Sequence, residues 1–339
     1  MGTYLNPGNS GFEDICRGRY VDKTGMIALI NDAIGTSDKL TCVSRPRRFG
    51  KTLMMSMLQE FFDINKNSGQ LFEGLAVSKN ARLCAEWMNK YPTLFLTLKN
   101  VEGSNFNEAL IFYRELVVSL CSANRCVLKN KNVSDEDKEL LRRVMARKAE
   151  VAELANVLQV LCRALEAHYG KPVIVLIDEY DVPINYAEQN GYYKEMIGFM
   201  RNLLGAALKS NPSLKFAVLT GCLRIAKESI FTGTNNFASY SVLDEKFSRY
   251  YGFLEDEVEA MLELADRKEA AAEIKEWYDG YVIGNSYVYC PWDVINHISA
   301  LRFKRTARPK NYWKNTSHNG ILLTFVKRTD FKVKGKFEI

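Results

Sequence analysis

The stretch VSRPRRFGKTL, residues 43–53, decides the fold that this sequence predicts. Its closing half, Gly50-Lys51-Thr52, matches the end of the phosphate-binding pattern G-x-x-x-x-G-K-[ST], in which backbone N–H groups cradle phosphates. Its opening half departs from that pattern, because Arg45 stands where the first Gly is expected. The alternative is a basic surface turn that contains the tripeptide by chance.

The segments on either side favour a phosphate-binding loop. Residues 39–44 (KLTCVS) form a short β-rich run, and residues 52–64 (TLMMSMLQEFFDI) place apolar side chains at helical spacing. The loop therefore joins a predicted strand to the start of a predicted helix, where the helix dipole favours an anion. We expect Lys51 to reach the β- and γ-phosphates and the Thr52 hydroxyl to bind Mg²⁺.

Strands and helices alternate through the first 250 residues. Further strands are expected at residues 93–98, 173–177 and 215–219, with amphipathic helices between them. The run VIVLI at 173–177 is apolar throughout, which is typical of a strand buried on both faces of a parallel sheet. This alternation predicts an α/β three-layer sandwich.

Two adjacent carboxylates, Asp178 and Glu179, follow that apolar strand. Ligands of open α/β sheets bind at the carboxyl ends of the strands. We expect Asp178 to hold Mg²⁺ through water, and Glu179 to orient or deprotonate an attacking water molecule. The alternative is a pair that caps the loop after the strand.

One extra strand, residues 93–98, separates the loop strand from the Asp-Glu strand in sequence, which fits the additional-strand class of P-loop ATPases. Thr220 ends the fourth strand, at the position of a polar sensor, and Arg224 follows it. Arg224 either reaches the γ-phosphate or is an ordinary surface charge. Arg47 and Arg48 either clamp phosphates, contact an acidic partner or are solvated, and Pro46 fixes one backbone angle at the loop entrance.

Seven blocks occur in order along the chain: YVDKTGMI, SRPRRFGKTL, VLIDEYDVPI, GCLRIAKESIFTGTNN, WYDGYVIG, YCPWDVI and YWKNTSHNG. Together they resemble the AAA-ATPase-like family of bacterial proteins, over residues 12–319. The resemblance implies a P-loop ATPase fold with ATP and Mg²⁺ as ligands, and then a helical or winged-helix region. Members often carry a PD-(D/E)XK nuclease-like domain beyond it. The resemblance also makes Arg45 the family's own form of the loop.

Carried over by position, the resemblance assigns residues to the site. The phosphate loop would comprise Arg45, Pro46, Arg47, Arg48, Phe49, Gly50, Lys51, Thr52 and Leu53. Asp178 and Glu179 take the metal and water positions, and Arg224 takes that of the arginine in LRIAKES. Asp22 and Lys23 belong to the VDKT block, to which chemistry assigns no role beyond bracing the loop.

The pattern of residue types changes near residue 250. We therefore predict an ATPase core at 1–250 and a smaller, mainly helical domain at 251–339. The E-x-K triplet at residues 273–275 lies in a helical pattern, so we expect no nuclease domain here and a chain that ends within a module. The aromatic blocks WYDGY and YCPW favour core packing over base stacking.

Composition limits the remaining classes. The chain has 339 residues and a net charge of +6, which is too small and dispersed to favour nucleic acid strongly. No apolar run reaches membrane-spanning length, and the eight cysteines form no C-x-x-C pair, which predicts reduced thiols in the cytoplasm. Three scattered histidines argue against zinc. An ATPase is favoured; a nucleotide-gated switch or scaffold is the alternative, and a protein partner or homo-oligomer stays open.

Overall fold

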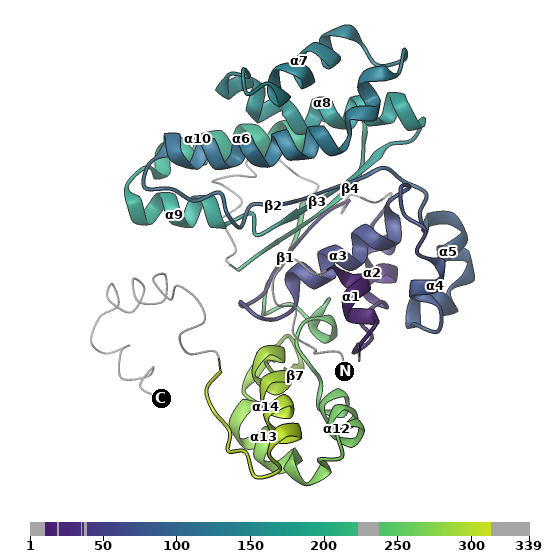
Figure 1. The fold of residues 1–339 in the computed structure, drawn as a ribbon, viewed down its shortest axis with the longest axis vertical. Helices are drawn as coiled ribbons and strands as arrows, with labels where there is room; N and C mark the ends of the chain where they lie inside the picture. The colour runs from purple at the N-terminus through teal and green to yellow at the C-terminus, as the bar shows by residue number, and fades with distance from the viewer. Residues whose placement is uncertain (1–10, 19, 35, 37–38, 223–236, 313–339) are drawn as a thin grey trace.

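A five-stranded parallel sheet forms the centre of the molecule (Figure 1). The computed structural model describes residues 11–18, 20–34, 36, 39–222 and 237–312. The strands are β1 (Leu40–Ser44), β2 (Thr93–Thr97), β3 (Val173–Asp178), β4 (Leu214–Gly221) and β5 (Phe237–Tyr240). Their spatial order is β2-β3-β4-β1-β5, and every neighbouring pair is parallel. Strand β4 therefore lies between the loop strand β1 and the Asp-Glu strand β3.

Helices cover both faces of the sheet, which confirms the predicted α/β architecture (Figure 1). One layer holds α6 (Phe106–Ala123), α7 (Asp135–Met145), α8 (Val151–Tyr169), α9 (Val182–Asn190), α10 (Tyr193–Leu204), the 3-10 helix η2 (Arg125–Lys129) and the π-helix η3 (Gly205–Lys209). The other holds α1 (Phe12–Cys16), α2 (Met26–Ala33), α3 (Lys51–Phe62), α4 (Gly69–Phe72), α5 (Ala81–Trp87) and the 3-10 helix η1 (Ala76–Lys79). The arrangement is consistent with a P-loop-type ATPase.

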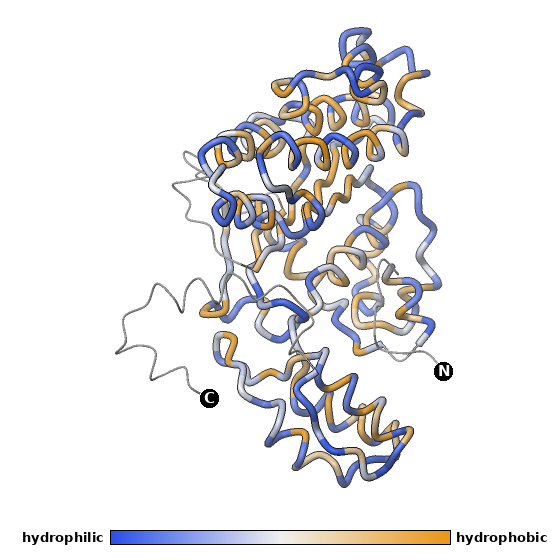
Figure 2. The backbone as a smooth tube through the Cα atoms, turned by 60° about the vertical axis from the view of Figure 1, so that its left-hand side comes forward, coloured by the Kyte–Doolittle hydropathy of each residue, from blue (hydrophilic) through white to orange (hydrophobic). Residues whose placement is uncertain are grey.

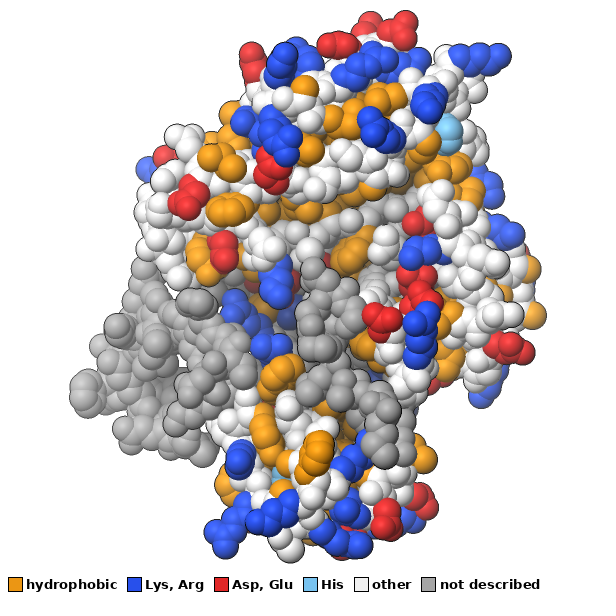
Figure 3. Space-filling view, in the orientation of Figure 1, with side chains coloured by type: hydrophobic (Ala, Val, Ile, Leu, Met, Phe, Trp, Pro, Cys, Tyr) orange, Lys and Arg blue, Asp and Glu red, His pale blue; other side chains and the backbone are white. Residues whose placement is uncertain are grey.

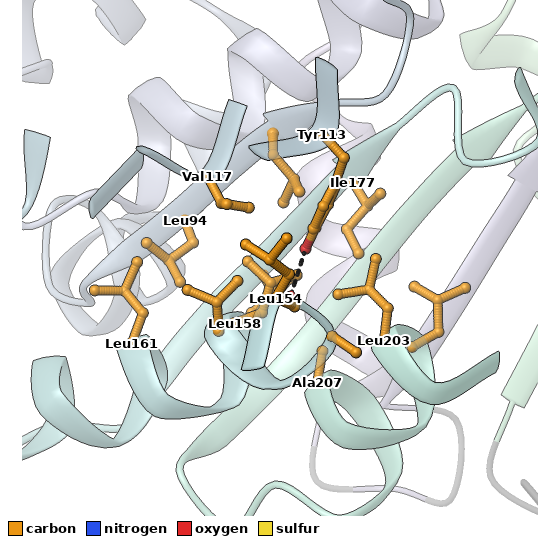
Figure 4. Close-up of a cluster of buried hydrophobic side chains, with 14 of the residues drawn as sticks. Leu94, Tyr113, Val117, Leu154, Leu158, Leu161, Ile177, Leu203 and Ala207 are labelled. Carbon is orange, nitrogen blue, oxygen red and sulfur yellow. Dashed lines mark hydrogen bonds between the residues drawn. The ribbon is translucent and has the colours of Figure 1, made fainter. Parts of the chain in front are cut away.

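Strand β3 shows why its sequence is apolar throughout. Val173, Val175 and Ile177 pack into the core beneath α6, α8 and α10, where the Tyr113 hydroxyl donates to the carbonyl of Leu154 over 3.4 Å (Figure 4). The intervening residues of β3 pack into a second core beneath α3. Burial of each such side chain contributes about 1.5–3 kcal/mol, so this strand fixes both layers to the sheet.

Short polar signals set the helix ends on the outer layer. The Ser134 side chain accepts a hydrogen bond from the Asp137 N–H over 3.1 Å and caps α7. Helix α8 ends at Gly170, whose φ of 67° is the left-handed conformation that glycine adopts most readily. These caps place the outer helices so that their apolar sides meet the sheet.

A separate hydrophobic cluster organises the chain after residue 252. The 3-10 helix η4 (Ser248–Tyr250) precedes this C-terminal region, which contains α12 (Glu255–Leu264), η5 (Lys268–Ala270), α13 (Ala271–Tyr278), the antiparallel hairpin β6 (Tyr281–Ile283) and β7 (Ser286–Val288), and α14 (Pro291–Phe303). Tyr251 still packs into the core beneath α3, whereas Phe253 belongs to the C-terminal cluster. The region is mainly helical; the boundary at 250 and a winged-helix topology stay predictions.

Hydrophobic and hydrophilic residues alternate along the helices of the described residues (Figure 2). Among the described residues, no helix is both long enough and apolar enough to cross a membrane. The E-x-K triplet at 273–275 lies within α13, as its sequence pattern predicts, and its Lys275 pairs with Glu255 of α12.

Candidate nucleotide-binding site

The loop between β1 and α3 has an unusual backbone. Arg48 and Gly50 both adopt left-handed conformations, with φ of 71° and 83°. No atom lies within 4 Å of a Cβ built at Gly50, so this position needs glycine for its φ rather than for space. Helix α3 begins at Lys51 directly afterwards, and its N-terminus faces the loop.

Lys51 is buried, and its ammonium group is bound inside the loop. Its Nζ donates to the carbonyls of Arg45 and Pro46, over 3.1 and 3.0 Å, and to the Cys222 Sγ over 3.2 Å. All three acceptors are uncharged. A phosphate oxygen carries charge and accepts a stronger hydrogen bond, so it could replace them.

Asp178 joins the loop helix to two strands. Its Oδ2 accepts from the Thr52 hydroxyl over 2.7 Å, and its Oδ1 accepts from the Thr220 hydroxyl over 2.5 Å. The carboxylate is buried, whereas Thr52 is exposed. These oxygen atoms suit Mg²⁺, which often takes one or two carboxylates and completes its shell with phosphates and water. The described residues contain no group of three or more His, Cys, Asp or Glu side chains placed to hold a metal, so phosphates would have to complete the shell.

Glu179 combines a strained backbone with a perturbed carboxyl group. Its φ of 53° is left-handed, which is uncommon for a residue with a side chain and recurs at functional sites. Burial and the neighbouring Asp178 raise the pKa of Glu179, while Lys51 and Lys99 oppose the rise. A raised pKa brings a carboxylate closer to the range useful for a general base.

Asp181 anchors the end of β4, a role that the sequence prediction missed. Its buried Oδ2 accepts from the Cys222 N–H over 3.0 Å and from the Asn185 side chain over 3.2 Å. A Cβ at Gly221 would lie 2.7 Å from both the Asp181 Oδ1 and the Tyr180 ring, so the two segments are in close contact. The sequence feature that could have indicated this role is the second Asp of DEYD, which is Asp181.

The Arg45 side chain stabilises the fold. It is fully buried, and its Nη1 donates to the carbonyls of Ser44 and Ser241 over 2.9 and 2.7 Å. Its guanidinium also lies over the Tyr251 ring, 5.3 Å from the centroid, and burial lowers the pKa of Arg45. The predicted contact with nucleotide has no support in this side chain, which is engaged with the segment after β5.

The remaining predicted loop residues divide between the site and its surroundings. Pro46 and Arg47 are partly exposed, and Leu53 packs against the core beneath α3. Arg48 and Phe49 contact the C-terminal region, through Trp292 and the hairpin. Lys and Arg side chains gather in the hollow between the upper layers and that region (Figure 3). Arg224 lies outside the described residues.

The comparison with known families agrees with this geometry. A family model described as "Predicted AAA-ATPase" matches residues 8–231. The chain belongs to the AAA-ATPase-like family. A relative from Azotobacter chroococcum mcd 1, described as "Uncharacterized protein in vnfD 5'region", is 31% identical over 298 residues, which are 88% of this chain and 50% of the relative. This chain therefore spans about half of that relative's length.

The VDKT block of this AAA-ATPase-like chain braces the N-terminal segment. Asp22 accepts from the Thr24 N–H over 2.8 Å and from the Ala76 N–H over 2.6 Å, so it holds α2 against η1. Lys23 is buried and donates to both carboxylate oxygens of Glu257, over 2.6 and 2.7 Å, and thereby reaches α12. The block ties the N-terminal segment to the core and to the C-terminal region.

Proposed function

We propose that this chain binds ATP with Mg²⁺ and hydrolyses it. The observation that carries the proposal is the contact of the Thr52 hydroxyl with the Asp178 carboxylate over 2.7 Å, beside a buried Lys51 at the start of α3. A P-loop ATPase needs these three groups together for the phosphates and their metal. Membership of the AAA-ATPase-like family supports the same activity.

Each residue would have a distinct role in hydrolysis. Lys51 would exchange the loop carbonyls for oxygens of the β- and γ-phosphates, where its charge stabilises the transition state. Thr52 and Asp178 would hold Mg²⁺, which neutralises charge on the phosphates when it is bound. Glu179 would orient the attacking water and accept its proton. Arg224 is proposed as a further cation at the γ-phosphate.

A nucleotide-gated switch with little turnover is the second candidate. The contacts of Arg48 and Phe49 with the C-terminal region favour it, since the loop touches a part of the chain that could respond to nucleotide. We place either activity in the cytoplasm, because the eight cysteines, all within the described residues, form no disulfide. Association with a protein partner, a further copy or nucleic acid stays a prediction.

Phosphate release from Mg-ATP tests the proposal, with Lys51→Ala and Glu179→Gln beside the wild type. We expect both variants to lose at least about tenfold in kcat, equivalent to ~1.4 kcal/mol of barrier. Lys51→Ala should also lose ATP binding, whereas Glu179→Gln should retain it. Lys194→Ala and Glu259→Gln, at exposed positions on α10 and α12, are matched controls that should behave as wild type.

The outcomes separate the two candidates. Turnover that depends on Lys51 and Glu179 supports hydrolysis. Tight binding without turnover, lost only in Lys51→Ala, supports the switch and removes the catalytic role of Glu179. A wild type that neither binds nor hydrolyses Mg-ATP overturns both.

A further inference from the structure

The tip of the phosphate loop lies against the C-terminal region. The Arg48 guanidinium sits over the Trp292 ring, 4.1 Å from its centroid, at the start of α14. The Phe49 and Tyr281 rings pack in a T-shaped arrangement, with centroids 4.9 Å apart, and Tyr281 belongs to β6. We call the residues that receive the tip the loop seat: Tyr281, Ile283, Val288, Cys290 and Trp292.

Phe49 fills the loop seat closely. It is only 1% exposed, although it belongs to a loop at the ligand-binding edge of the sheet. It packs with Ile283, Val288 and Cys290 in a small cluster of its own. A Cβ at the neighbouring Gly252 would lie 3.3 Å from the Phe49 ring and 3.0 Å from Val288, so the seat has little spare room. Movement of the hairpin would therefore move the loop.

The loop backbone needs this support. Arg48 has a φ of 71°, a conformation that is unfavourable for a residue with a side chain unless its surroundings stabilise it. Stacking of Arg48 on Trp292 and burial of Phe49 are favourable contacts on either side of that strained backbone. Gly50 and Lys51 follow directly, so the backbone that would receive phosphate is continuous with the part held by the seat.

We propose that Trp292 and the hairpin β6–β7 position the phosphate loop. They hold the loop in the shape that receives phosphate, so the C-terminal region sets the affinity for ATP. This inference rests on the proposed nucleotide site and assigns its control to a region beyond residues 8–231, the part matched by the family model. Linkage makes the effect reciprocal: bound nucleotide would strengthen the contact between the loop and its seat.

The first test needs no nucleotide. Hydrogen–deuterium exchange of residues 45–50 should be faster in Trp292→Ala than in wild type, since the strained loop loses a support. Trp292→Phe keeps an aromatic face but loses the Nε1 donor that bonds the Tyr312 carbonyl over 3.1 Å. Exchange near wild type in Trp292→Phe would assign the effect to stacking on Arg48. Trp277→Ala, an exposed tryptophan of α13, is the matched control.

The second test measures the Kd for Mg-ATP in the same variants. We expect Trp292→Ala to raise Kd about fivefold or more, the scale of one cation–π contact, and Trp292→Phe to raise it less. Arg48→Ala and the double variant Arg48→Ala/Trp292→Ala complete a cycle. If the two residues act through their contact, the second substitution adds little to the first.

The proposal fails if Trp292→Ala leaves both the loop exchange and the Kd at wild-type values. It also fails if Arg48→Ala and Trp292→Ala weaken binding additively, because Arg48 would then contact phosphate independently of Trp292. Failure of the proposed function looks different: the wild type itself would not bind Mg-ATP, while the exchange experiment would still report whether the seat holds the loop.

Discussion

Glu179 lies in an environment unlike that of a surface carboxylate. Its backbone is left-handed, and burial together with Asp178 raises its pKa. Natural proteins retain such unfavourable features chiefly where activity depends on them. Ionised Glu179 should therefore lower the stability of the fold while it serves the chemistry.

The first residue-scale prediction concerns the pH dependence of that trade-off. Because the folded-state pKa of Glu179 is raised, its protonated form is favoured by folding, and stability from this group is gained as pH falls through the folded pKa. Glu179→Gln should be more stable than wild type at pH 8, by about 0.5–2 kcal/mol. The difference in stability between the variant and wild type should be smaller at pH 5, and thermal unfolding at both pH values measures this difference. A difference that is the same at both pH values would contradict a raised pKa of Glu179.

Sequence reasoning locates the chemical groups of the site better than it distinguishes the arginines. Lys51, Thr52 and Asp178 were predicted from motif and strand position, and they do lie together. Arg45 was placed among the nucleotide-binding residues by the resemblance, because it occupies the position of the first Gly of the loop. Only the position of the chain after β5, which supplies the carbonyl of Ser241, shows that its side chain is internal.

At the scale of elements, the close contact between the end of β4 and the start of α9 can be tested with alanine. Gly221→Ala should destabilise the protein by about 1–3 kcal/mol, because its Cβ would overlap Asp181 and Tyr180. Gly198→Ala is the matched control within α10, where a Cβ meets nothing within 4 Å. That change should stabilise the helix by about 0.5–1 kcal/mol. Urea unfolding measures the change in the free energy of unfolding for both variants. Equal changes in the two variants would contradict the close contact at Gly221.

The elements found from sequence are those with a strong periodic signal. The strands at 93–97 and 173–178 were predicted to within one residue at their carboxyl ends. Amphipathic helices were expected between these strands, where α6 and α8 lie. Strand β5, only four residues long, was missed because FASY carries neither an apolar run nor clear alternation. The hairpin β6–β7 was not predicted as a hairpin, and its residues were described only as an aromatic block. Its contact with Phe49 of the phosphate loop joins residues that are distant in sequence.

At the scale of the whole molecule, Lys23 and Glu257 join two parts of the chain that lie far apart in sequence. Their side chains are 5% and 19% exposed. Glu257→Gln should destabilise the protein by about 3–5 kcal/mol, because it leaves a buried ammonium without its counter-charge. Glu255→Gln removes an exposed ion pair with Lys275 from the same helix and should change stability by less than about 1 kcal/mol. Chemical denaturation compares the two; a similar small loss in both would contradict the bracing role of Lys23.

The strand order also has a consequence for folding of the protein during its synthesis on the ribosome. Strand β1 has no partner close in sequence: Leu40 pairs with Ala217 of β4 and with Phe237 of β5. Strands β2 and β3 can pair with each other earlier, because both emerge before β4. Domains form as their segments leave the ribosome, and distant pairings form slowly. The stretch that would bind phosphate is thus synthesised before both strands that pair with β1, so a chain shortened before β4 would carry the motif without the site.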